Sequence, residues 1–154
     1  MESLIATRAV FERIERESAA LIGHRLFTVT AFDAATMQVQ RVYSSNPAVY
    51  PLGGRKPKRD TEFGRRVLVE GRTLVCEGDA EIARIFDDHP TIIGLGLHSS
   101  INAPVLDERG CVGVLNFLMP ASRVTAAQTR CARQCAAERD VIDALVACAT
   151  GIRP

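Results

Sequence analysis

Two asparagine side chains, Asn102 and Asn116, are conspicuous because each lies within a stretch of otherwise apolar residues. Both stretches are rich in Val, Leu and Ile, and the charged, glycine-ended segment 107–110 between them is typical of a hairpin connection. A buried carboxamide needs hydrogen-bond partners. The two amides are therefore candidates for contact with a ligand, and the alternative is that each bonds to a neighbouring loop backbone.

A second group of residues that could bind a ligand lies in segment 43–59. Its three prolines and two adjacent glycines argue against regular structure, yet its tyrosines are too apolar for a free tether. We expect an ordered loop that covers one end of the sheet as a lid. Six basic residues follow within twelve positions, and they could hold a carboxylate or phosphate, or simply form a solvated basic loop: Arg55, Lys56, Lys58, Arg59, Arg65 and Arg66.

The cysteines are better explained as buried core residues than as metal ligands or reactive thiols. Five cysteines, an odd number in a chain of 154 residues, are typical of reduced thiols. Cys131 and Cys135 lie four positions apart on an expected helix and could share a metal, but no further ligand has recognisable spacing. We interpret them as small core residues, and we expect neither a metal nor a cofactor.

Composition limits the broad class. With 47% hydrophobic residues, 24% charged residues and a net charge of +1, the chain has no basic excess for nucleic acid. Charged residues interrupt the N-terminal segment, and no long apolar run occurs, so we expect neither a targeting signal nor a membrane span. For that reason we also expect the protein in the cytoplasm. The length favours a single domain, residues 1–154.

The elements that must position these groups follow from periodicity. The second expected strand places Met37, Val39, Arg41 and Tyr43 on one face. The expected order is a helix at 2–21, strands at 25–32 and 37–44, the long loop, a helix at 60–70, a strand at 73–77, helices at 80–86 and 90–94, the hairpin within 99–119, and one last helix from 122 or 125 to 150. This order predicts an α+β domain with an antiparallel sheet.

In this order the chain resembles the GAF domain family of small sensory domains over nearly its whole length. The central hairpin carries the resemblance, with Asn-Ala-Pro-Val-Leu at 102–106 and Val-Gly-Val-Leu-Asn at 112–116. Segment 43–57 looks like that of short, stand-alone bacterial GAF proteins. The resemblance implies a PAS/profilin-like sheet of about six strands, with the terminal helices on one face and a pocket covered by loop and helices on the other. It also implies a homodimer through the terminal helices.

Position in this fold gives the candidate ligand-binding residues. Helix-capping or surface roles are the alternative for the two histidines, and packing with a bonded hydroxyl is the alternative for the two tyrosines. The candidates are Tyr43, Ser45, Tyr50, Arg55, Phe63, Cys76, Phe86, His89, His98, Ser100, Asn102 and Asn116.

Three activities of the family are disfavoured by the residues present. Reductases of free methionine-R-sulfoxide use a cysteine just before the first central strand, where this chain has residues 97–99, Leu-His-Ser. The cyclic-nucleotide signature is absent, and Leu97 stands where bilin-binding domains have a cysteine. We therefore expect a non-catalytic small-molecule sensor. The alternatives are a methionine-sulfoxide-type enzyme that uses Cys76 and a structural dimerisation module.

Overall fold

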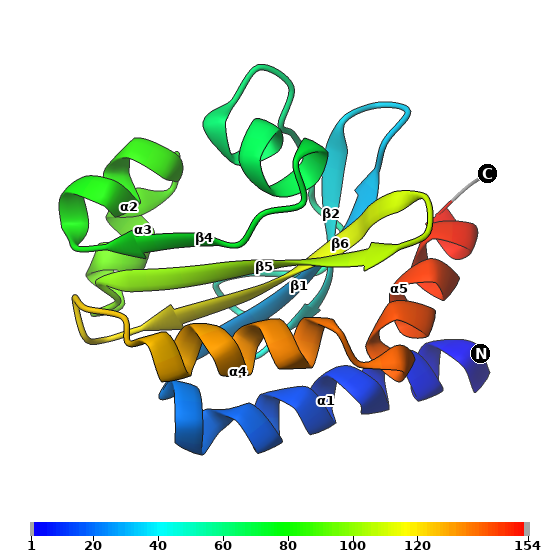
Figure 1. Ribbon diagram of the computed structural model, residues 1–154, viewed down its shortest axis with the longest axis horizontal. Helices are drawn as coiled ribbons and strands as arrows, with labels where there is room; N and C mark the ends of the chain where they lie inside the picture. Colours follow the sequence, from blue (N-terminus) through cyan, green and yellow to red (C-terminus); the bar gives the residue numbers. More distant parts are fainter. Residues whose placement is uncertain (1, 153–154) are drawn as a thin grey trace.

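The computed structural model describes residues 2–152 as a six-stranded antiparallel sheet flanked by helices (Figure 1). The strand order is β3-β2-β1-β6-β5-β4. The strands are β1 (Leu26–Asp33), β2 (Gln38–Ser44), β3 (Arg55–Pro57), β4 (Leu74–Glu77), β5 (Ser99–Asp107) and β6 (Gly110–Met119).

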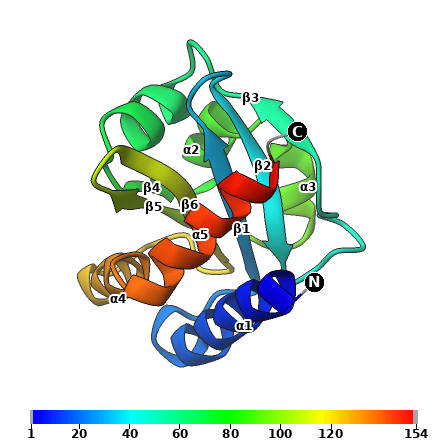
Figure 2. The ribbon, with the colours of Figure 1, turned by 90° about the vertical axis from the view of Figure 1, so that its right-hand side faces the viewer.

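The helices divide between the two faces of the sheet. One face is covered by α1 (Glu2–Ile22), α4 (Ala126–Ala136) and α5 (Arg139–Ile152), and Figure 2 shows α1 and α4 side by side while α5 crosses the sheet. The other face carries the π-helical turn η1 (Gly64–Val69) with α2 (Asp79–Ile85) and α3 (His89–Gly94). This layering confirms the arrangement that the resemblance implies.

The hairpin β5–β6 forms the middle of the sheet, as the sequence predicts. Its alternation places Ile101, Leu115 and Phe117 against α1, α4 and α5, where each is fully buried. Phe117 stacks on Phe27 of β1 with ring centroids 5.0 Å apart. The helix-covered face is therefore a closely packed apolar core.

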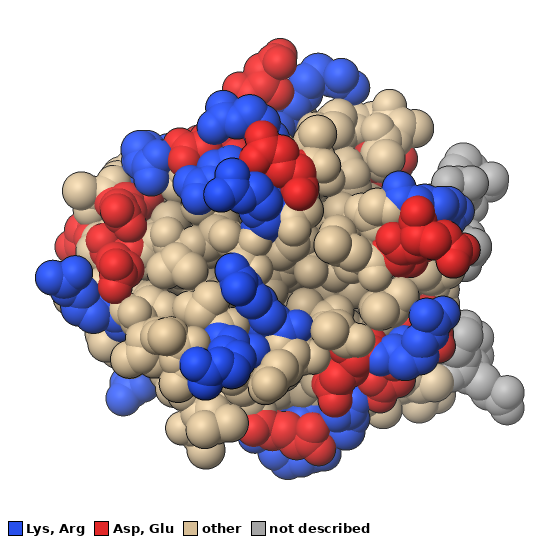
Figure 3. All heavy atoms as spheres, viewed as in Figure 1, with Lys and Arg blue, Asp and Glu red and all other residues tan. Residues whose placement is uncertain are grey.

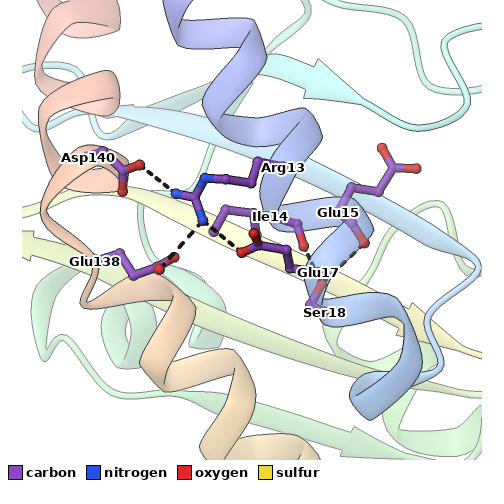
Figure 4. Close-up of polar contacts among 7 residues, drawn as sticks. All are labelled: Arg13, Ile14, Glu15, Glu17, Ser18, Glu138 and Asp140. Atoms are coloured by element: carbon purple, nitrogen blue, oxygen red, sulfur yellow. Dashed lines mark hydrogen bonds and ion pairs between the residues drawn. The ribbon is translucent and has the colours of Figure 1, made fainter.

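The C-terminal helical segment corrects one prediction, because it is two helices and not one. The chain turns at residues 137–138, although the turn contains neither Gly nor Pro. Arg13 of α1 forms ion pairs with Glu138 in this turn at 3.6 Å and with Asp140 in the first turn of α5 at 2.5 Å (Figure 4). A tertiary ion-pair cluster accompanies the break, and local sequence signals give no hint of it.

Segment 43–59 also departs from the prediction of a loop without regular structure. Residues 55–57 form the short edge strand β3, whose Arg55, Lys56 and Pro57 pair with residues 38–40 of β2. Proline is tolerated there because an edge strand leaves one side of its backbone unpaired.

A β-bulge corrects the predicted facing of β2. Arg41 lies opposite Thr30, whereas Tyr43 lies opposite the adjacent Val29, so β2 has one extra residue between them. Tyr43 therefore turns to the helix-covered face, where it packs on Phe11 and Phe27. Val39 and Arg41 stay on the other face.

Candidate ligand-binding cavity

The sheet face opposite the terminal helices carries a partly open cavity of about 80 Å³. By the same measure one water needs roughly 10–15 Å³, so the space suits a molecule of several non-hydrogen atoms. Strands β1, β2, β5 and β6 form its floor, and segment 50–63 with residues 86–92 forms its roof. The lining residues are Leu26, Thr28, Thr30, Val39, Arg41, Tyr50, Lys56, Lys58, Phe63, Phe86, Asp87, Asp88, Ile92, Asn102, Asn116 and Leu118.

Five of the twelve candidate ligand-binding residues line this cavity. Tyr50, Phe63 and Phe86 come from the roof, and Asn102 and Asn116 from the floor. Phe63 and Phe86 meet edge to face, with ring centroids 6.3 Å apart. The loop that was expected to act as a lid does contribute to the roof, through Tyr50.

The other candidates lie outside the lining. The Tyr43 hydroxyl donates to Glu15 of α1, and the Ser45 hydroxyl accepts from the backbone N–H of Phe27 at 2.9 Å. Arg55 pairs with Asp33 at 3.0 Å. The remaining four are also absent from the cavity wall: Cys76, His89, His98 and Ser100.

Two of these four, His98 and Cys76, make contacts elsewhere in the structure. His98 Nδ1 lies 2.6 Å from the Asp79 carboxylate at the start of α2, on the surface. Cys76 is fully buried beside Ser100, and burial raises the pKa of its thiol. Of the twelve candidates, the structure therefore leaves in the candidate site only those on the central strands and on the segments that form the roof.

The two asparagines form one hydrogen-bonded chain across the floor. Asn102 lies opposite Asn116 in the β5–β6 register, and its Nδ2 donates to Asn116 Oδ1 at 2.8 Å. Asn116 Nδ2 donates in turn to the Thr28 hydroxyl at 3.2 Å. The chain ends at Asn102 Oδ1, a buried acceptor that has no hydrogen-bond partner in the described part of the chain. Such an atom carries a desolvation cost that a bound donor would remove.

Arg41, Tyr50 and Asp88 build one wall of the cavity. The Tyr50 hydroxyl donates to Asp88 Oδ2 at 2.6 Å, and the Arg41 guanidinium lies 5.0 Å above the Tyr50 ring. Burial and this hydrogen bond raise the pKa of Tyr50. Arg41 Nη1 donates to the carbonyl of Pro51 at 2.9 Å, but the buried Arg41 Nε has no hydrogen-bond partner among residues 2–152.

Lys58 supplies a second cation from the roof. Its ammonium lies 4.9 Å from the centre of the Phe63 ring, and burial lowers the pKa of the amine. Gly64 permits this position, because a Cβ there would lie 2.1 Å from the carbonyl oxygen of Lys58. Residue 64 must therefore be glycine for the lysine backbone to approach η1 so closely.

Within the basic run, few residues face the cavity. Lys56 and Lys58 line it, whereas Arg55, Arg65 and Arg66 form ion pairs with acidic residues elsewhere. On the face shown in Figure 3, acidic and basic side chains are interspersed. The run is therefore divided between a solvated surface and the cavity wall.

Comparisons with known proteins identify the architecture. No family model and no curated protein matches the sequence. Among solved structures, the GAF domain/HD domain protein from Geobacter sulfurreducens matches with a TM-score of 0.70 and 14% identity, over 96% of this chain and 94% of that one. The GAF domain from an Acinetobacter phosphoenolpyruvate-protein phosphotransferase matches with a TM-score of 0.67 and 14% identity, over 98% of both chains. The chain has the fold of a GAF domain.

A GAF domain of a two-component sensor histidine kinase from Bacillus halodurans matches as well, with a TM-score of 0.67, 11% identity and coverage of 94% of this chain and 97% of that one. These structural matches, at identities of 11–14%, establish the GAF fold, which is found in signalling sensor proteins. They do not identify a ligand or an activity. Within residues 2–152, no helix of this GAF-like chain is long and apolar enough to cross a membrane.

Proposed function

We propose that this GAF-like chain is a sensory domain that binds a small molecule in the cavity between the sheet and its roof. The observation that supports this most is Asn102 Oδ1, a fully buried acceptor that has no hydrogen-bond partner among the described residues and belongs to a residue lining the partly open cavity. A site needed only for packing is better served by an apolar residue there, because an unbonded amide oxygen is destabilising.

Signal transmission follows from the shared sheet. Strands β1 and β6 form the cavity floor on one face and contact α5 on the other. A ligand that binds one arrangement of the roof more tightly shifts the population toward that arrangement. The terminal helices then report the shift.

Thermal-shift screening against a metabolite library tests the proposal. A compound present at a hundred times its dissociation constant should stabilise the fold by about 2.7 kcal/mol. The control is Asn102→Leu, for which the same compound should give a smaller shift. A library in which nothing stabilises the wild type would contradict the proposal.

A thiol enzyme of the methionine-sulfoxide type is the competing function. A nucleophilic cysteine needs access and a lowered pKa, whereas Cys76 is fully buried and its pKa is raised. Cys111 has a pKa raised to about 11 by burial. We therefore expect no thiol-dependent turnover of free methionine sulfoxide. Turnover that disappears in Cys76→Ser would favour the enzyme instead.

We further propose a homodimer through the terminal helices. The outward face of α1 carries Ile5, which is 65% exposed, and the exposed residues Ala9, Glu12, Arg16 and Ala20 at helical spacing. An antiparallel pair of such helices about a twofold axis brings Glu12 of one copy beside the partner's Arg16. The small alanines allow close approach.

Sedimentation measurements test this arrangement. Arg16→Glu should weaken the dimer through like-charge repulsion, and the double variant Glu12→Arg/Arg16→Glu should restore it. A dimer that is insensitive to both changes would refute this interface. A dimer that forms while no ligand is found would favour the structural dimerisation module.

A further inference from the structure

Several polar groups of the cavity wall lack a hydrogen-bond or ion-pair partner among the described residues, and they comprise cationic donors on one side and an acceptor on the other. On β2, Arg41 Nε has no hydrogen-bond partner within residues 2–152. Among the residues that the structure describes, Arg41, Lys56 and Lys58 also form no direct ion pair. On β5, Asn102 Oδ1 accepts no hydrogen bond from any described residue. The cavity thus presents unused positive donors and one unused acceptor.

The acidic residues of the wall do not remove this imbalance. Asp88 accepts the Tyr50 hydroxyl, and Asp87 and Asp88 act on Lys58 only through space. The wall holds three cations and two carboxylates, of which Lys56 and Asp87 are exposed. The partly buried charges are therefore the two cations Arg41 and Lys58 against the single carboxylate Asp88. Cations taken out of water and left without a direct partner are destabilising, and a bound anion removes that cost.

From this pattern we infer that the ligand is a small carboxylate that also carries a hydrogen-bond donor. Its carboxylate binds the Arg41 guanidinium and the Lys58 ammonium, and its hydroxyl or amino group donates to Asn102 Oδ1. This inference rests on the proposed sensory function and specifies the ligand class for the same cavity. The volume of about 80 Å³ restricts the class to short acids.

A panel of short compounds separates the two requirements. Lactate and alanine carry both groups, propionate lacks the donor, and 1,2-propanediol lacks the charge. One carbon longer, 3-hydroxybutyrate and 3-aminobutyrate are compared with butyrate and 1,3-butanediol. By titration calorimetry, at least one compound with both groups should bind about tenfold or more tightly than its two matched analogues.

Variants assign the two ends. Lys58→Met should reduce the preference for the acid over the diol, because Arg41 remains as the other cation, and should weaken acid binding more than diol binding. Asn102→Leu should remove the preference for the hydroxy acid over the plain acid. The matched control is Arg55→Met, a change in the same basic run at a residue that pairs with Asp33 outside the cavity. It should bind like the wild type.

Other outcomes overturn the inference in distinguishable ways. If library compounds bind in the cavity but no panel acid exceeds its diol, the ligand class is wrong and the sensory function stands. If neither the panel nor the library contains a binder, both are wrong. Equal loss of acid binding in Arg55→Met and Lys58→Met would show only general attraction by the basic run.

Discussion

The two faces of the sheet use the same strands for different purposes. On the helix-covered face, Phe27, Ile101 and Phe117 are fully buried among apolar neighbours. On the cavity face, the same strands present Thr28, Asn102 and Asn116, and the amide oxygen of Asn102 has no hydrogen-bond partner among the residues described. Alternation along a strand thus separates the groups that stabilise the fold from the groups available to a ligand. Substitutions on the helix-covered face should therefore lower the free energy of unfolding and leave ligand binding nearly unchanged, whereas substitutions on the cavity face should mainly change ligand binding.

The largest effect is expected from Phe117→Ala on the helix-covered face. Removal of this ring leaves a cavity beside Phe27 and His24, and should lower the free energy of unfolding by about 3–5 kcal/mol. Urea unfolding measures this loss. The dissociation constant of any cavity ligand should change little for the fraction that remains folded. A large change in that constant would break the separation of the two faces.

Gly64→Ala should have the next largest effect and act on the cavity side. Its Cβ would collide with the carbonyl oxygen of Lys58, so the segment must move, at a cost of about 1–3 kcal/mol. Because the shift displaces Lys58, carboxylate binding should weaken as well. Unfolding and calorimetry together measure both effects. Lost stability with unchanged binding would show that the position of Lys58 is unimportant.

Arg13→Met should cost about 1 kcal/mol, because the ion pairs of this side chain are only partly buried. The variant removes the cluster at the turn between α4 and α5 without touching the cavity. Protection of amides near residues 137–140 from hydrogen exchange should fall, while ligand binding is retained. Unchanged exchange at the turn would mean that Arg13 does not stabilise it.

The smallest effect, and one of opposite sign, is expected from Lys58→Met. Burial lowers the pKa of Lys58 below its ordinary 10.5, so the charged amine is less favourable in the folded chain than in the unfolded one. This loss of stability is complete below the folded pKa and disappears as pH rises through that value toward the unfolded one. The variant should therefore be slightly more stable than the wild type near neutral pH.

Unfolding measured near pH 7 and again at about pH 10 checks the sign, because the advantage of Lys58→Met should shrink at the higher pH. Arg55→Met serves as the exposed control. A variant that is less stable than the wild type at both values would mean that the contact of Lys58 with Phe63 outweighs the cost of burial.

The sequence indicates the sheet better than the details of the site. Alternating apolar residues predict the central hairpin and single out Asn102 and Asn116, because polar residues on an apolar strand are conspicuous. The bulge that turns Tyr43 to the other face depends on pairing with β1. The division of the basic run likewise depends on acidic partners distant in the sequence, such as Asp33 for Arg55.

The break between α4 and α5 also depends on contacts between residues that are distant in the sequence. Its turn contains neither glycine nor proline, and its ion-pair partner, Arg13, lies on a helix at the other end of the chain. Arg41 could have been found, since an arginine beside Val39 on an apolar strand face is as conspicuous as the asparagines. The position of Lys58 over the cavity depends on packing against η1, which local sequence does not specify.

The most direct test of the difference between the faces is a titration of isotope-labelled protein, followed by nuclear magnetic resonance, with the panel compounds that carry both groups: lactate, alanine, 3-hydroxybutyrate and 3-aminobutyrate. The side-chain amides of Asn102 and Asn116 and the backbone amides near Tyr50 and Lys58 should shift together in a saturable way. Residues of the core between α1 and α4, which do not touch the ligand, should shift less than the cavity residues. Saturable shifts confined to the helix-covered face, or no saturable shift at either asparagine, would contradict a carboxylate site in the cavity.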